Sequence, residues 1–279
     1  MAEKQQGAGG YFKGPTSRVV EVSDNQLPQF IQIDQLPINL VDKGVGLKPV
    51  FGKNLMLAIS SPVAVPIADI LEWSCLLDEL GVAGFGWGLV WTDGETLHHY
   101  RSVDGIRKDS IASRALRGVT WTRGFVHLRR PSLMSTIGHV NAQPYVSQDR
   151  DWAFAHNGFL KQHRDFRAQY QDDLRGTSDS EVGFQYWLRR LSENPSLTGS
   201  LIETHQALGG NANFMALHRR GDLAVYAGNE ENPVYTFEMN GIRIASTSLH
   251  SHDNFLFEDV FPGASRIEHL PPGTAHLMP

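Results

Sequence analysis

Residues 152–158 read Trp-Ala-Phe-Ala-His-Asn-Gly, an apolar run that closes on an Asn-Gly pair. The run predicts a β-strand from Trp152 to His156, and Asn157-Gly158 is a strong turn signal. Similar turn pairs separate other apolar runs, and this favours a series of meandering antiparallel strands. The other predicted strands cover residues 55–60, 86–91, 96–101, 120–128, 213–219, 223–227, 234–238 and 242–246.

Helical spacing of apolar residues fills the intervals between these strands. The first predicted helix has Ile67, Leu71 and Cys75 on its apolar side and stops at Gly81. A second helix is predicted from about Ser180 to Leu191, and shorter ones over residues 110–116, 162–170 and 200–208. Strands and helices in blocks, without strict alternation, predict an α+β or layered αββα architecture.

Length and composition narrow the class of protein. The chain has 279 residues, of which 41% are hydrophobic, so it can bury a sizeable core. Its net charge of −5 gives no global attraction to nucleic acid or to an anionic membrane surface. We expect no membrane span, because no run of about 18 apolar residues exists. The first twenty residues lack the apolar segment of a secretory signal.

Cys75 is the single cysteine of the chain. One cysteine excludes an internal disulfide and any multi-cysteine metal site, and it favours a reducing, cytoplasmic compartment. The dense histidine segments, 98–99 and 250–253, have no matching ligand cluster, so we predict no metal and no cofactor.

Residues 1–53 differ in composition from the rest of the chain. They mix polar, Gly-rich and Pro-containing pieces, whereas dense globular patterning begins near Leu55. We therefore expect an extended N-terminal arm over residues 1–53, which lies on a surface of this protein or of a partner, and one domain over residues 54–279.

Three segments contain candidate functional residues. His127 and Arg129 are two apart in a predicted strand and face the same side, where an arginine can grip a carboxylate. Taken alone, they are equally typical of an exposed cationic strand end. Asn157 and Gly158 can aim a side-chain amide and a backbone N–H at an oxyanion, although an Asn-Gly pair is first of all a turn.

The third segment opens the second predicted helix. Ser178-x-x-Glu181 fits a capping box, and Asp179 lies favourably near the positive helix end. Capping alone accounts for these residues. In the functional interpretation, the Asp179 carboxylate holds a ligand ammonium group.

The order of these motifs is more specific than any one of them. His-x-Arg (127–129) is followed by Asn-Ala-Gln-Pro-Tyr (141–145), Phe-Ala-His-Asn-Gly (154–158) and Ser-Asp-Ser-Glu (178–181). This series resembles the class II glutamine amidotransferases, an N-terminal-nucleophile family whose glutaminase domain supplies ammonia or acts on γ-glutamyl amides. Two further segments, 86–88 and 244–249, resemble other family motifs, so the resemblance runs from about residue 54 to the end.

The resemblance implies a fold and a set of roles. The fold would be an αββα sandwich of two antiparallel sheets between helical layers. Arg129, with His127 beside it, would bind the α-carboxylate of glutamine, and Asp179 its α-ammonium group. Asn157 and Gly158 would form the oxyanion hole.

The chain departs from the family at the nucleophile. The family uses an N-terminal cysteine, whose own α-amine acts as the base. The matching stretch here begins with Asn54, which is preceded by 53 residues without a cysteine. Cys75 lies on an apolar helix face, where a cysteine is normally an inert packing residue. Ser60 and Ser61 are placed near the end of the first core strand, too far along it to replace the nucleophile.

Three functional hypotheses follow from this departure. The first is a non-catalytic glutaminase-like subunit that still binds glutamine, glutamate or a γ-glutamyl compound and works with a separate synthase or ligase subunit. The alternative is an active amidotransferase or γ-glutamyl amide hydrolase with an unusual nucleophile. The third is an assembly partner whose pocket is vestigial.

Overall fold

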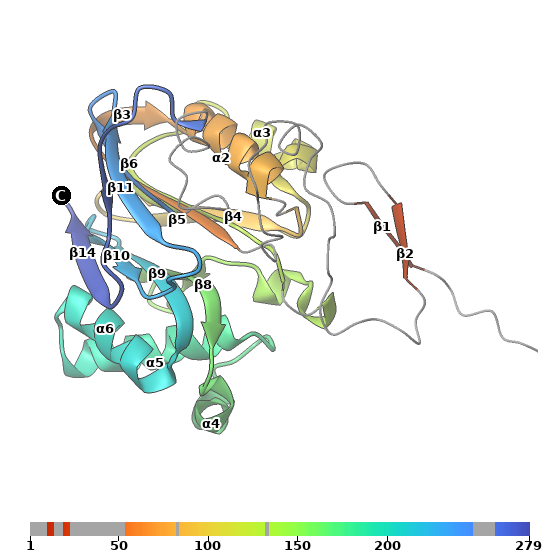
Figure 1. Ribbon diagram of the computed structural model, residues 1–279, viewed down its shortest axis with the longest axis vertical. Helices are drawn as coiled ribbons and strands as arrows, with labels where there is room; N and C mark the ends of the chain where they lie inside the picture. The colour runs from red at the N-terminus through yellow and green to blue at the C-terminus, as the bar shows by residue number, and fades with distance from the viewer. Residues whose placement is uncertain (1–9, 14–18, 23–53, 82–83, 132–133, 248–259) are drawn as a thin grey trace, which may run out of the picture.

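The computed structural model describes residues 10–13, 19–22, 54–81, 84–131, 134–247 and 260–279. Most of the described chain forms strands and helices (Figure 1). The strands are β1 (Gly10–Lys13), β2 (Val19–Val22), β3 (Leu55–Pro66), β4 (Trp87–Thr92), β5 (Leu97–Ser102), β6 (Thr120–Leu128), β7 (Tyr145–Val146), β8 (Trp152–Leu160), β9 (Gly210–His218), β10 (Leu223–Ala227), β11 (Val234–Met239), β12 (Ile242–Thr247), β13 (Ser265–His269) and β14 (Thr274–Met278). The helices are α2 (Ile67–Gly81), α3 (Ser110–Ala115), α4 (His163–Arg167), α5 (Asp179–Glu193) and α6 (Leu197–Leu208), and the short 3-10 turns are η1 (Ile106–Lys108), η2 (Met134–Thr136), η3 (His139–Asn141) and η4 (Ala168–Tyr170).

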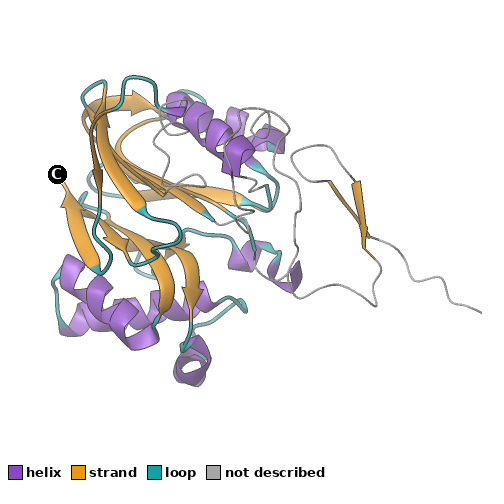
Figure 2. Cartoon of the chain, in the orientation of Figure 1, coloured by secondary structure: helices purple, strands orange, loops and turns teal. Residues whose placement is uncertain are grey.

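Two antiparallel sheets pack face to face between helices. The larger has seven strands in the order β13-β11-β12-β3-β6-β4-β5, and the smaller has five in the order β14-β10-β9-β8-β7. Helix α2 lies on the outer face of the larger sheet, while α5 and α6 cover the smaller one (Figure 2). The predicted αββα sandwich is thereby confirmed.

Three apolar clusters correspond to the three spaces between the four layers. The first joins α2 to the larger sheet and includes Ile70 and Leu57; the second lies between the sheets, where Phe125 and Met215 are fully buried. The third packs α5 and α6 on the smaller sheet around Trp187. Alternate residues of β3 enter different clusters, as the two-residue period of a strand buried on both faces requires.

Cys75 lies on α2 and is half-buried against the first apolar cluster. Burial raises the pKa of its thiol, and the nearby Asp78 carboxylate raises it further. Both effects keep the sulfur protonated and weakly nucleophilic. The predicted position of Cys75, on the apolar face of a helix, is confirmed.

Several predicted boundaries are wrong, and two of them concern candidate site residues. Asn157-Gly158 is not a turn, because β8 continues to Leu160 and pairs residue by residue with β9. The first core strand also runs further than expected, to Pro66, so Ser60 and Ser61 lie in its middle and are buried. In both cases, pairing with a long neighbouring strand outweighs the local preference of the sequence.

The predicted capping box of α5 is half right. The Ser178 side chain is the N-cap and accepts a hydrogen bond from the backbone N–H of Glu181. The Glu181 carboxylate does not return to Ser178. It accepts from the backbone N–H groups of Arg175 and Gly176, at 2.8 and 2.7 Å, and so closes the preceding loop onto the helix.

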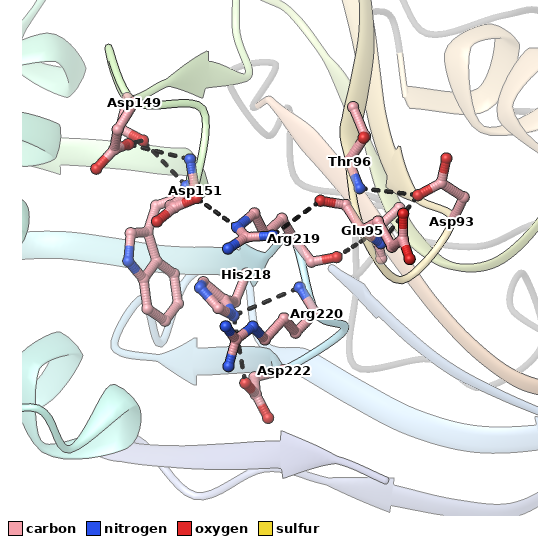
Figure 3. Close-up of polar contacts among 12 residues, drawn as sticks. Asp93, Glu95, Thr96, Asp149, Asp151, His218, Arg219, Arg220 and Asp222 are labelled. Carbon is pink, nitrogen blue, oxygen red and sulfur yellow. Dashed lines mark hydrogen bonds and ion pairs between the residues drawn. The ribbon is translucent and has the colours of Figure 1, made fainter.

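A polar cluster ties the two sheets together at one end of the sandwich (Figure 3). Arg219, just after β9, forms an ion pair with Asp151 and donates to the carbonyl of Glu95 in the β4–β5 turn. The Thr92 hydroxyl donates to the Arg219 carbonyl. Arg123 of β6 donates to the carbonyl of Gly221, so a second arginine also crosses between the sheets.

Most of the predicted arm, residues 1–53, lies outside the described residues, and so do the segments 82–83 and 248–253. The two described pieces of the arm, β1 and β2, pair with each other as an antiparallel ladder. Within the described ranges, no helix is long and apolar enough to span a membrane. The same ranges contain no group of three or more His, Cys, Asp or Glu side chains placed to hold a metal ion.

Candidate functional site

The predicted site residues gather where β3 begins and where β6 and β8 end. Asn54 immediately precedes β3, and its backbone carbonyl accepts a hydrogen bond from the Asn157 side-chain amide of β8. The Asn54 side-chain oxygen accepts from the backbone N–H of Arg130 at 2.6 Å. Asn54 therefore joins the end of β6, in the larger sheet, to the end of β8, in the smaller one.

A network of buried asparagines fixes the Asn157 side chain. Its oxygen accepts from Asn213 at 3.1 Å and from Asn232 at 3.0 Å, and Asn232 also donates to the Asn54 carbonyl at 3.2 Å. Asn213 accepts in turn from the backbone N–H groups of residues 228 and 229, both at 3.0 Å. Each of these side-chain amides has hydrogen-bond partners, so the Asn157 side chain cannot rotate freely.

Asn213 and Asn232 were missed by the sequence interpretation. Asn213 lies within the predicted strand 213–219, and asparagine is disfavoured in strands because its amide must find buried partners. An asparagine within an otherwise apolar strand was the available signal that this position binds something polar.

Gly158 follows Asn157 and allows β8 to approach β9 closely. Its φ is +130°, and a Cβ atom there would lie 1.9 Å from the Asn211 carbonyl oxygen. Gly88 of β4 is equally constrained, since a Cβ would lie 2.3 Å from the Gln143 carbonyl oxygen. Only glycine fits either position, which explains two of the motifs that stand out in the sequence.

His127 is completely buried beside this network. Its Nε2 lies 3.2 Å from the His156 carbonyl oxygen, which also accepts from the Gln143 amide at 3.0 Å. Its Nδ1 has no hydrogen-bond partner among the described residues. Burial, reinforced by the positive charge of Arg129, lowers the pKa of His127 from 6.5 to about 3. The imidazole is therefore neutral and does not attract a carboxylate by charge.

Arg129 and Asp179 are the two charged groups of the site. Arg129 is buried, and its guanidinium donates to the carbonyl and hydroxyl oxygens of Thr136 at 2.8 and 2.9 Å. Burial lowers the Arg129 pKa, while the nearby Tyr145 and the Asp179 carboxylate oppose this effect. Arg129 and Asp179 are thus close enough to interact electrostatically.

Asp179 is fixed at the start of α5. One carboxylate oxygen accepts from the backbone N–H of Leu160 at 2.9 Å, and the other accepts from that of Ser180 at 2.9 Å. The first bond attaches α5 to the end of β8, two residues beyond Gly158. The arrangement offers one cation and one anion near each other, which suits a zwitterionic amino acid.

The layering and this position of the site define an N-terminal-nucleophile type of sandwich. The family model for class II glutamine amidotransferases matches residues 55–234, and the chain belongs to that family. Among curated proteins, it is 25% identical over 149 residues to a glutamine–fructose-6-phosphate aminotransferase (isomerizing) of Halalkalibacterium halodurans. The match covers 50% of this chain and 24% of that protein.

Solved structures agree on the fold. Glutamine phosphoribosylpyrophosphate amidotransferase from B. subtilis superposes with a TM-score of 0.64 at 21% identity, over 80% of this chain and 46% of that one. A glutamine aminotransferase class-II domain protein from Silicibacter pomeroyi gives a TM-score of 0.52 at 16% identity, over 80% and 98% of the respective chains. The chain thus spans about half of the first of these structures and about a quarter of the curated relative.

Proposed function

We propose that this chain is a non-catalytic member of its family, which binds glutamine, glutamate or a γ-glutamyl compound without cleaving it. In this proposal, Arg129 binds the α-carboxylate and Asp179 the α-ammonium group, while Asn157 and Gly158 surround the side-chain amide. Asn54 stands where the family has its nucleophile.

The position of Asn54 is the main observation in favour of this proposal. A carboxamide is not a nucleophile for acyl transfer, and the nitrogen of Asn54 belongs to a peptide bond and cannot act as a base. The family match begins at Leu55, directly after this residue. The Asn54 carbonyl also receives the Asn157 amide, the group assigned to stabilise an oxyanion. The covalent step therefore lacks its nucleophile and its base, and the donor of the oxyanion hole is already engaged.

Retention of the binding groups is the second argument. Arg129 and Asp179 are each held by hydrogen bonds to the fold, and burial strengthens their electrostatic effect on a ligand. An ionic pocket for a zwitterion is costly to keep buried unless a ligand or the fold uses its charges. The Asp179 carboxylate also has a structural role, because it accepts a hydrogen bond from the backbone N–H of Leu160. The hydrogen bonds described for the Arg129 guanidinium go only to Thr136.

The proposal is tested by calorimetry and by an ammonia-release assay on the purified full chain. Glutamine should bind without turnover, and Arg129→Ala should weaken binding by at least about 30-fold, because removal of one side of a charge-assisted pair costs about 2–5 kcal/mol. Arg164→Ala on the exposed face of α4 is the matched control and should bind like the unmodified chain. Measurable glutamate release at a rate that Asn157→Ala abolishes would contradict the proposal.

One contact favours the alternative of an unusual nucleophile. The Ser180 hydroxyl lies 2.9 Å from His156 Nδ1, the distance of a nucleophile from its base. Both residues are buried, however, and the Ser180 hydroxyl also accepts from Gln143 at 3.2 Å. We therefore assign the hydrogen bond between Ser180 and His156 a structural role, in which it holds α5 against β8. Ser180→Ala would distinguish a nucleophilic serine from a structural one. Only if Ser180 is the nucleophile of an active hydrolase would the variant lose turnover while its ligand affinity stays unchanged.

We further propose that the chain works as a subunit of a larger synthase or ligase, with residues 1–53 as the arm that contacts the partner and residues 54–279 as the glutaminase-like domain. A pull-down with the full chain and with a chain that lacks residues 1–53 tests both parts. The full chain should retain a stoichiometric partner that the shortened chain loses. Equal capture by both would assign the contact to the domain.

A further inference from the structure

A cavity of about 980 Å³ lies beside the proposed glutamine pocket and has no role in the function proposed above. It opens where β5 and β7, edge strands of the two sheets, meet α5. Tyr145 of β7 lines it and donates or accepts a hydrogen bond with Ser178, the residue before Asp179, at 2.7 Å. Arg129 and Asp179 do not line the cavity, so it is a separate site.

Four basic side chains line this cavity. His99 and Arg101 come from β5, Arg150 from the loop after β7, and Arg175 from the loop before α5. Burial and the charges of Arg101 and Arg150 lower the pKa of His99, and Arg175 adds to the effect of burial on Arg101. Four basic groups therefore converge on one space.

Arg101 and Arg150 donate to backbone carbonyls and not to carboxylates. Arg101 donates through Nη1 to the Ala142 carbonyl at 2.9 Å. Arg150 donates to the Leu97 carbonyl at 3.2 Å. Within the described ranges, no carboxylate lies within ion-pair distance of Arg101, Arg150 or Arg175.

Three acidic residues also line the cavity, namely Asp149, Asp173 and Glu181. Both Glu181 oxygens accept from backbone N–H groups. One oxygen of Asp149 accepts from the Ser147 hydroxyl and from the backbone N–H of residue 151. Asp173 is exposed on a loop. The formal charges of the three arginines and the three carboxylates balance, but within the described ranges these carboxylates form no ion pair with the arginines.

Apolar side chains also line the cavity. Trp152 is one of them and is half-buried, with its ring held by Trp187 edge-on and by His218 at a centroid distance of 4.4 Å. Leu188 and Leu191 of α5 are two others. A rigid aromatic surface next to aliphatic side chains accommodates a flat apolar group. The volume is at the upper end of the range for small-molecule sites.

We propose that this cavity binds a small amphipathic anion, whose phosphate or carboxylate group is held by Arg101, Arg150 and His99 and whose apolar body packs on Trp152 and α5. The basis of this assignment is that one cavity is lined by three arginines without an ion-pair partner in the described chain and by the apolar side chains of Trp152 and α5. It does not depend on glutamine binding or on the state of the nucleophile.

The test uses the full chain and two dyes that differ only in charge. 8-Anilinonaphthalene-1-sulfonate has an anionic group on an aromatic body, and N-phenyl-1-naphthylamine is the same body without it. The anionic dye should bind with a stoichiometry of one. Arg101→Gln and Arg150→Gln should each weaken it at least about tenfold, the effect of one charge-assisted hydrogen bond. Arg164→Gln, a substitution of an exposed arginine on α4, is the control and should change neither dye.

Competition with small anions identifies the head group that the cavity prefers. Phenyl phosphate and benzoate present a phosphate and a carboxylate on the same ring, and the stronger competitor names the preferred head group. The proposal is overturned if the anionic dye binds all variants equally or binds at several equivalent sites. If Arg101→Gln weakens both dyes, that variant has lost its fold, and Arg150→Gln decides the question because Arg150 is exposed and its substitution leaves the core unchanged.

Discussion

His127 should make the stability of this protein sensitive to mild acid. The imidazole is buried with one nitrogen unpartnered, and burial together with the Arg129 charge lowers its pKa from 6.5 to about 3. In the unfolded chain the same group titrates near its usual value. At pH values between about 3 and 6.5, His127 binds a proton in the unfolded chain but not in the folded chain, so acid favours unfolding.

The size of the effect follows from the two pKa values. The contribution of His127 to the free energy of unfolding is fully present above pH 6.5 and falls by about 1.4 kcal/mol for each pH unit below it. At pH 5.0 about 2 kcal/mol is lost, a large part of the stability of an ordinary domain. The pKa of His156 is also lowered by burial, so that residue adds a loss in the same direction.

Urea unfolding followed by tryptophan fluorescence at pH 7.5 and pH 5.0 measures this loss. His127→Gln keeps a hydrogen-bond donor but cannot be protonated, so it should lose about 2 kcal/mol less than the unmodified chain between the two pH values. The comparison is made within each variant, so a lower starting stability cancels. His276→Gln, on an exposed strand position, is the control. An equal loss in His127→Gln and the unmodified chain would refute the buried neutral imidazole.

Three further substitutions test the packing of the site and of the sandwich by urea unfolding. Gly158→Ala should cost about 3 kcal/mol, because its Cβ would overlap a backbone carbonyl at positive φ, whereas Gly138→Ala, which meets nothing within 4 Å, should change stability by less than about 0.5 kcal/mol. Asn213→Ala should cost about 3 kcal/mol, since it leaves two backbone N–H groups without their buried acceptor and removes one of the two donors to the Asn157 oxygen. Arg219→Ala should cost only about 1 kcal/mol, because its ion pair is one-third exposed.

The layers of the fold were predictable from the sequence because they depend on periodicity. The strand 120–128 and the helix starting at Ile67 have the bounds that their apolar patterns predict. Strand β7 was not predicted, because two residues are too few to show a period. Strand β13 was missed because its exposed, polar sequence resembles a loop. Strand β14 was also missed, because its five residues do not alternate strictly between apolar and polar.

The site was predictable in its membership and not in its contacts. Asn54, Asn157 and Asp179, which the motifs single out, lie on neighbouring elements of the fold, and their roles in binding stay a prediction. Which partner each side chain takes depends on tertiary structure. No local pattern indicates that Glu181 holds the loop before it or that Asn213 orients Asn157 from a neighbouring strand.

The two ends of the sandwich are joined by different chemistry, and this has a consequence for how it opens. At one end the Arg219 guanidinium, held by its ion pair with Asp151 just before β8 of the smaller sheet, bridges to the Glu95 carbonyl of the larger one, and at the other end Asn54, Asn157 and Asn232 bridge the sheets with neutral buried amides. Added electrolyte screens the first bridge and leaves the second almost untouched. Raising the ionic strength should therefore speed hydrogen exchange around the β4–β5 turn while the asparagine end keeps its protection, so that the sandwich loosens from one end only.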